Sequence, residues 1–139
     1  MQTFLPYPDF VKSAECLDYR RLGKQRVEAK QILNALERGE GGWYNHPATK
    51  MWEGYEVALK QYHDVMITEW KHRGYNNNMP LYGVTTMIFP TWFGNDSFHA
   101  SHRSNLLRKD PVWYGQFSWE EPDHLEYIWP TQNRGVLTA

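Results

Sequence analysis

The chain has 139 residues and a formal net charge of −1, which suits one domain and argues against a protein that coats nucleic acid through overall positive charge. Its single cysteine, Cys16, excludes an internal disulfide and a zinc site built from several cysteines. No apolar run is long enough to cross a bilayer, and the N-terminus lacks the pattern of a secretion signal. We therefore expect a cytoplasmic protein.

Aromatic residues are abundant, because seven Trp, nine Tyr and six Phe make up 16% of the chain. This is more than a small core needs, so some rings should lie at the surface or line a cleft. Exposed rings stack on bases or bind partners, although packing in the core is the commoner role of any one of them.

The N-terminal part of the sequence predicts an extended segment followed by a long helix. Prolines at positions 6 and 8 favour extended backbone over residues 1–12. Ser13 is a suitable N-cap for a helix that ends near Arg38, and its apolar side is formed by Leu22, Ala29, Leu33 and Leu36. Gly23 lies inside this helix and indicates either the close approach of a backbone or ligand, or a packing contact between helices.

A second helix is predicted from a cap at Asn45 or His46, with Pro47 in its first turn, to just before Gly74. Its apolar stripe recurs every three to four residues and should be core: Met51, Tyr55, Leu59, Tyr62, Met66 and Trp70. Residues 75–95 read as a loop with a short apolar stretch, VTTMIF, that is either a strand or a buried loop.

A third helix should begin at a cap formed by Asp96 or Ser97 and stop before Pro111. The aromatic tail beyond it has no helical period. We therefore expect an all-α fold, a single domain over residues 1–139 with three main helices, long loops and an irregular aromatic C-terminal arm.

The first predicted helix carries a dense group of cations. Residues three to four apart share one side of a helix, and this spacing produces a polar stripe of Arg20, Arg21, Lys24, Glu28 and Gln31, with Arg26 and Lys30 close by. A solvated face with a Lys24–Glu28 pair is the simpler interpretation. The density of cations favours a face that neutralises phosphate groups.

The third predicted helix offers a second polar group. His99, His102 and Arg103 share one face, where two histidines at this spacing could bind a metal, but no third ligand is evident. Phosphate binding or structural hydrogen bonding is the better interpretation, with Asn105 as a further phosphate contact. Cys16 has no neighbour that would activate a thiol, and we expect neither a cofactor nor a metal.

Three stretches, in the same order, resemble the phage-type pyrimidine-dimer DNA glycosylase/AP lyase known as endonuclease V. They are LDYRRLGKQR, HPATKMWEGYEVALKQYHDVMITEWKHRGY and LLRKDPVWYGQF. The resemblance implies a monomeric, cofactor-free helical enzyme that binds damaged or modified duplex DNA. It also implies that the α-amine of the first residue attacks C1′ of the damaged nucleotide, forms a Schiff base and permits β-elimination of the 3′ phosphate.

The resemblance also assigns roles along the first helix. The nucleophile falls on Met1, because Gln2 is usually too large for removal of the initiator methionine. Arg20 matches the family's first arginine, and Lys24 stands where the family has its second. Arg21 occupies the position of the family's catalytic glutamate, and arginine cannot act as a base at physiological pH. Glu28, which lies on the same face, is the expected replacement, with Asp18 and Glu15 as second choices.

Several aromatic residues are candidates for contacts with an opened base stack. Trp113 and Tyr114 match the family, and Trp43 and Tyr44 precede the second helix together with His46. Two alternatives remain at this point. One is a noncatalytic nucleic-acid-binding module, and the other is a hydrolase or transferase for a small nucleotide-like substrate with His99, His102 and Glu28 in its pocket.

Overall fold

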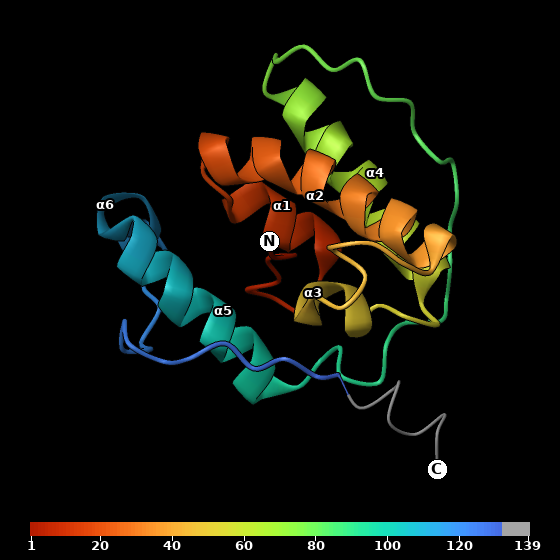
Figure 1. The fold of residues 1–139 in the computed structure, drawn as a ribbon. Helices are drawn as coiled ribbons and strands as arrows, with labels where there is room; N and C mark the ends of the chain where they lie inside the picture. The colour runs from red at the N-terminus through yellow and green to blue at the C-terminus, as the bar shows by residue number, and fades with distance from the viewer. Residues whose placement is uncertain (132–139) are drawn as a thin grey trace.

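The structure is a computed structural model in which residues 1–131 are described. The described chain is all-α and contains no strand. Its helices are α1 (Phe10–Cys16), α2 (Tyr19–Arg38), α3 (Pro47–Lys50), α4 (Glu56–His72), α5 (Asp96–Lys109) and α6 (Pro111–Tyr114), followed by a 3₁₀ turn, η1 (Gly115–Phe117). The N-terminal segment lies in the middle of the molecule, between α2, α3 and α5 (Figure 1).

The first predicted helix is two helices, and Ser13 is not its N-cap. Asp9 caps α1 by accepting a hydrogen bond from the backbone N–H of Lys12, so Ser13 lies inside α1. The chain then leaves the helix at Leu17 and Asp18, where the Asp18 N–H donates to the phenol oxygen of Tyr114 at 3.0 Å. This bond takes up a donor at the start of α2, and it is made by a residue far along the sequence.

The second predicted helix is also divided. His46 is confirmed as a cap, since its Nδ1 accepts the Ala48 N–H at 3.0 Å. However, α3 ends at Lys50, and a turn containing Gly54, whose φ is 89°, separates it from α4. Helix α5 begins one residue earlier than predicted, because Asn95 caps it through the Phe98 N–H.

The core forms where α2 packs against α4, and the predicted apolar stripes meet there. Met51, Leu59, Tyr62, Met66 and Trp70 are buried as expected, and Tyr55 is half-buried. Gly23 marks a helix-packing contact, because a Cβ at this position would lie 3.0 Å from the indole of Trp70. The two longest helices therefore approach closely at one defined point.

Long loops and an extended arm complete the described chain. The stretch VTTMIF forms no strand, and Met87 within it is 93% exposed. After η1 the chain runs along α5 (Figure 1), and it is fixed there because Asn105 donates to the Leu125 carbonyl and Ser104 Oγ accepts the Leu125 N–H. Residues 132–139 of the predicted aromatic arm lie outside the described residues. Among residues 1–131, no helix has the length and apolar character needed to cross a membrane.

Candidate active site

A pocket opens where the N-terminus meets α2. It has a volume of about 870 Å³, within the range of ligand pockets, and it is open to solvent. Met1 and Gln2 line it together with one side of α2, while Trp70, Lys109 and Tyr127 reach it from other elements. The first residue of the chain is therefore part of a pocket wall.

The backbone N–H groups of the N-terminal segment are held by side chains from distant elements. The Gln2 N–H donates to Glu28 Oε2 at 2.8 Å, and the Phe4 N–H donates to Gln25 Oε1 at 2.9 Å. The Leu5 N–H donates to His102 Nδ1 at 2.8 Å. Because every one of these bonds crosses to α2 or α5, the start of the chain has a fixed direction into the pocket.

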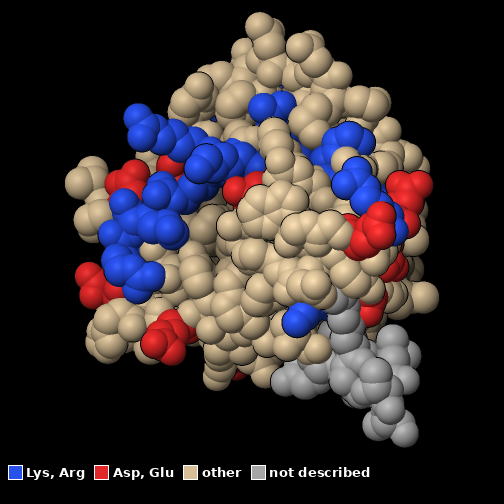
Figure 2. All heavy atoms as spheres, viewed as in Figure 1, with Lys and Arg blue, Asp and Glu red and all other residues tan. Residues whose placement is uncertain are grey.

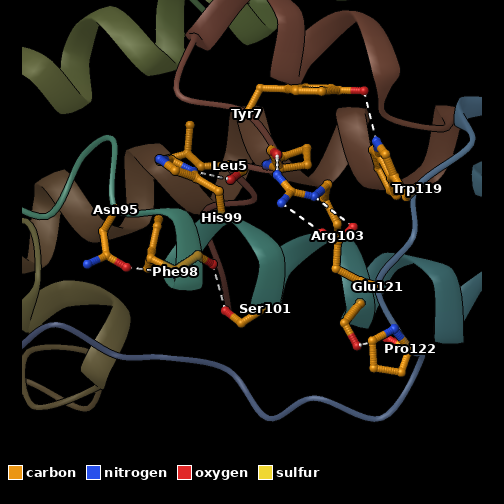
Figure 3. Close-up of polar contacts among 12 residues, drawn as sticks. Leu5, Tyr7, Asn95, Phe98, His99, Ser101, Arg103, Trp119, Glu121 and Pro122 are labelled. Carbon is orange, nitrogen blue, oxygen red and sulfur yellow. Dashed lines mark hydrogen bonds and ion pairs between the residues drawn. The ribbon is translucent and has the colours of Figure 1, made fainter.

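The carbonyls of the same segment are also bonded (Figure 3). His99 Nδ1 donates to the Leu5 carbonyl at 2.7 Å, and a guanidinium nitrogen of Arg103 donates to the Pro6 carbonyl at 2.7 Å. Arg103 also forms a two-pronged ion pair with Glu121, both contacts at 2.9 Å. The polar side chains of α5 thus anchor the N-terminal segment and the C-terminal arm.

Charges near the N-terminus interact with one another. Burial lowers the pKa of His46, and the positive charge of the N-terminal amine lowers it further, while Glu28 opposes the shift. The pKa of His46 therefore depends on both the N-terminal amine and the Glu28 carboxylate. Its ring lies edge-on to Trp43 and Trp129, at 5.6 Å and 5.8 Å between ring centres.

A cationic surface borders the pocket. Lys and Arg gather where α2 begins and α5 ends (Figure 2). Burial lowers the pKa of Lys109, and the neighbouring charges of Arg21, Arg108 and Lys24 lower it further, which places four cations together. Arg21 is partly neutralised by Asp18, whose carboxylate oxygen lies 3.1 Å from the guanidinium. This surface and the pocket together can hold a polyanion next to the N-terminal amine.

A family model for pyrimidine dimer DNA glycosylases matches residues 1–83 of the chain. The chain belongs to this family. The matched range holds α1 to α4 and therefore most of the pocket wall, whereas Lys109 and Tyr127 come from beyond it. No curated protein and no solved structure matched the chain. The family assignment made from the sequence is confirmed.

Within this family framework, the pocket brings together the residues predicted on the first long helix. Met1, Arg20, Arg21, Lys24 and Glu28 all line it. Glu28 is not ion-paired with Lys24, and its carboxylate instead accepts the Gln2 N–H. Of the second choices for the carboxylate, Asp18 is buried and bonded to Tyr114 and Arg21, and Glu15 is exposed outside the pocket. Arg26 lies over the indole of Trp70 and donates to Asn77.

The predicted contacts of α5 with DNA are not supported. His99, His102 and Asn105 are each at most 1% exposed, because the N-terminal segment and the C-terminal arm cover this face. They act in structural hydrogen bonding, and none of them lines the pocket with Glu28. The alternative of a hydrolase or transferase for a small nucleotide-like substrate required His99, His102 and Glu28 in one pocket, and the structure does not bring them together there. Within residues 1–131, no cluster of three metal-ligating side chains is found.

The predicted aromatic contacts divide into two groups. Tyr114 is fully buried, with its hydroxyl bonded to Asp18, so its role is structural. Trp113 is 37% exposed and donates to the Cys16 carbonyl, while Trp43 is partly exposed beside His46. Tyr44 is half-buried and donates to Glu53.

Cys16 is buried, and burial raises the pKa of its thiol to about 12, which agrees with the prediction of an inert cysteine.

The sequence interpretation did not identify several residues of the pocket. Gln25 could have been found, because it is polar yet stands between Leu22 and Ala29 on the apolar side of the first long helix. Tyr127 and Lys109 had no such signal, since their place in the pocket depends on how α5 and the arm fold back.

Proposed function

We propose that the protein is a DNA N-glycosylase with AP lyase activity whose nucleophile is the α-amine of Met1. One observation carries this proposal. Met1 lines the pocket next to Glu28, whose carboxylate is bonded to the Gln2 N–H, one peptide unit from the amine. Membership of the pyrimidine dimer DNA glycosylase family supports DNA as the substrate, as does the cationic surface beside the pocket.

The reaction requires an unprotonated amine, and an α-amine loses its proton more easily than a lysine side chain. The amine nitrogen forms a bond to C1′, and the glycosidic bond breaks as the base leaves with the bonding electrons and gains a proton. The sugar ring then opens to an imine on the amine nitrogen. Loss of a proton from C2′ expels the 3′ phosphate by β-elimination, and water releases the protein.

Glu28 is the carboxylate for these proton transfers. From its position beside Gln2 it can accept a proton from the attacking amine and stabilise the positive charge that develops on the sugar. Arg20, Lys24 and Lys109 surround the same pocket and would neutralise the flanking phosphates. A lesion must be brought to this surface, and the open shape of the pocket allows the approach of a duplex strand.

The test is reduction of the imine by borohydride on a duplex with one abasic site, and on an ultraviolet-irradiated duplex. We expect a covalent protein–DNA adduct that disappears when a Gly-Ser extension is added before Met1. Lys24 and Lys109 are the internal competitors, because both side chains line the same pocket. Peptide mapping should place the adduct on residue 1, and Lys24→Arg and Lys109→Arg should both retain it.

If the extended chain forms as much adduct as the original chain, the nucleophile is a lysine side chain and not the amine of Met1. No adduct on either duplex would reject the lyase and leave the noncatalytic DNA-binding module.

A further inference from the structure

Arg21 is fixed by a buried carboxylate at the start of α2. Its Nη1 donates to Asp18 Oδ1 at 3.1 Å. Asp18 is 7% exposed, and the same carboxylate oxygen accepts a hydrogen bond from the hydroxyl of Tyr114. That hydroxyl also accepts the backbone N–H of Asp18 at 3.0 Å. Tyr114 therefore holds Asp18 at two points, and Asp18 in turn holds the guanidinium of Arg21.

Asp18 is charged at neutral pH. Burial alone would raise the pKa of Asp18, but the hydrogen bonds from Tyr114 and Arg21 and the charge of Arg21 lower it below its ordinary value. A charge-assisted bond between a carboxylate and a guanidinium restricts the orientation of the guanidinium. Arg20 and Lys24 are exposed side chains of the same helix. They lose rotamer freedom when they bind a ligand, whereas Arg21 is already ordered.

The guanidinium of Arg21 lies at the pocket wall among other cations. Arg21 lines the pocket together with Lys24 and Lys109, and its side chain is 23% exposed. Figure 2 shows Lys and Arg gathered at this place. A guanidinium has five N–H donors, and among the described residues Asp18 is the one acceptor that Arg21 contacts. Since like charges this close repel one another, an anion bound between them would stabilise the group.

The two phosphates that flank a target nucleotide differ in the proposed β-elimination. The 5′ phosphate remains a diester with a single negative charge. The 3′ phosphate leaves as a monoester, which carries a charge of roughly −1.5 to −2 at neutral pH. An ordered group of cations stabilises this additional charge without having to reorganise during the reaction. The 3′ phosphate is therefore the one that gains most from a fixed guanidinium.

We propose that Arg21 binds the phosphate on the 3′ side of the target nucleotide, and that Asp18 and Tyr114 are positioning residues that hold its guanidinium for this contact. The inference rests on the proposed function, because it takes the 3′ phosphate to be the group that is expelled. It gives a role to the residue that stands where the family has its catalytic glutamate. In this chain that position contacts the leaving group, and Glu28 supplies the carboxylate.

Binding to duplexes with one neutral methylphosphonate tests the contact. Each probe duplex carries a tetrahydrofuran abasic analogue, and the methylphosphonate replaces the phosphate on its 3′ side or its 5′ side. The 3′ sensitivity is the ratio of Kd for the 3′-substituted duplex to Kd for the unsubstituted one. We expect a ratio of roughly ten for the wild type, as for loss of one charge-assisted hydrogen bond. Arg21→Gln lacks the contact, so its ratio should be below about two, whereas the 5′ substitution should affect both proteins equally.

Asp18→Ala tests the positioning role. It removes a negative charge beside the cations, which by itself would strengthen binding to DNA. We expect instead that its 3′ sensitivity falls toward that of Arg21→Gln, and that Asp18→Asn, which retains an acceptor oxygen, restores the sensitivity. Tyr114→Phe removes only the hydroxyl and should also lower the 3′ sensitivity, so it carries the test if Asp18→Ala does not fold. Circular dichroism verifies the fold of each variant.

Arg73→Gln is the matched control. Arg73 is also paired with a carboxylate, Glu69 at 2.7 Å, its side chain is 18% exposed, and it does not line the pocket. It should retain the 3′ sensitivity of the wild type. On a duplex with a natural abasic site and at saturating protein, Arg21→Gln should slow strand scission at least roughly tenfold and leave borohydride trapping of the imine within about twofold.

A 3′ sensitivity of Arg21→Gln equal to that of the wild type, or a difference confined to the 5′ substitution, would overturn the phosphate contact. Unchanged 3′ sensitivity in both Asp18→Ala and Tyr114→Phe would reject the positioning roles. A tetrahydrofuran site cannot form an imine, so the binding results are independent of the lyase. Imine trapping by a wild type without 3′ sensitivity would reject the contact alone. A 3′ sensitivity without trapping would reject the proposed chemistry and retain the contact.

Discussion

Glu28 shares its pocket with the cationic side chains of α2, and its carboxylate accepts a hydrogen bond from the backbone N–H of Gln2, beside Met1. A group placed there for stability alone could be replaced by any acceptor. Glutamine has nearly the same shape, and its amide oxygen can still accept the Gln2 N–H. The amide cannot take up a proton or stabilise a cation as a carboxylate does. Glu28→Gln therefore separates the structural role from the chemical one.

We expect Glu28→Gln to lower the rate of abasic-site cleavage by a factor of about 10² to 10⁴, the usual contribution of a general base. Thermal unfolding should change little. Single-turnover cleavage at saturating protein measures the effect on chemistry apart from binding. Glu15→Gln serves as the control, since it removes an exposed carboxylate outside the pocket. Full activity of Glu28→Gln would remove Glu28 from the mechanism.

At the scale of elements, the sequence correctly predicted those features that depend on the spacing of nearby residues, such as which side chains share one face of a helix. The face of α2 that bears Arg20, Lys24 and Glu28 could be predicted because helical periodicity alone places these residues together. The break before α2 could not, since the bond that occupies the Asp18 N–H comes from Tyr114 at the other end of the chain. The turn after α3 did have a local signal in Gly54, but the apolar periodicity of the surrounding residues outweighed it.

The histidines of α5 show the same limit. Spacing placed His99 and His102 on one face, which is correct, but it could not indicate that the N-terminal segment covers that face. Chemistry-bearing residues on a helix therefore become site residues or structural ones according to what packs against them. In this protein, α5 supports the segment that carries the proposed nucleophile, and α2 supplies the surface on which that nucleophile would act.

Anchoring of the N-terminal segment by His102 should make the protein sensitive to acid. Burial lowers the pKa of His102 to about 3, and His99 adds to the shift, from an ordinary value of 6.5. Because the folded chain disfavours the protonated ring, His102 does not lower the free energy of unfolding above pH 6.5, where the ring is neutral in both the folded and the unfolded chain. Stability is lost as the pH falls from 6.5 toward 3. At pH 5 the expected loss from His102 is about 2 kcal/mol.

Urea unfolding at pH 8 and pH 5 measures this loss. His102→Asn retains an acceptor for the Leu5 N–H but does not titrate, so the stability difference between the two pH values should shrink by about 2 kcal/mol. Phe98→Leu destabilises the same region without removing a titrating group, and it should keep the wild-type difference. An equal pH dependence in His102→Asn and the wild type would contradict the assignment.

At the scale of the whole molecule, a net charge of −1 coexists with a local cationic surface, and binding to DNA should depend on the surface. Each phosphate neutralised on a duplex contributes about −0.9 to the slope of log K against log salt. Lys109→Ala removes one cation of the cluster beside the pocket. We expect the slope to become shallower by about 1, with weaker binding to damaged and undamaged duplexes alike.

Arg38→Ala is the comparison for this measurement. Arg38 is exposed in the last turn of α2, roughly 27 Å from Arg20 at the helical rise per residue. That distance exceeds the range of screened interactions at physiological salt, so its removal should leave the slope unchanged although the net charge changes equally. Fluorescence anisotropy between 50 and 200 mM salt, roughly the range over which such contacts are usually measured, gives both slopes. Equal slopes for the two variants would mean that total charge, and not the surface beside the pocket, governs the association with DNA.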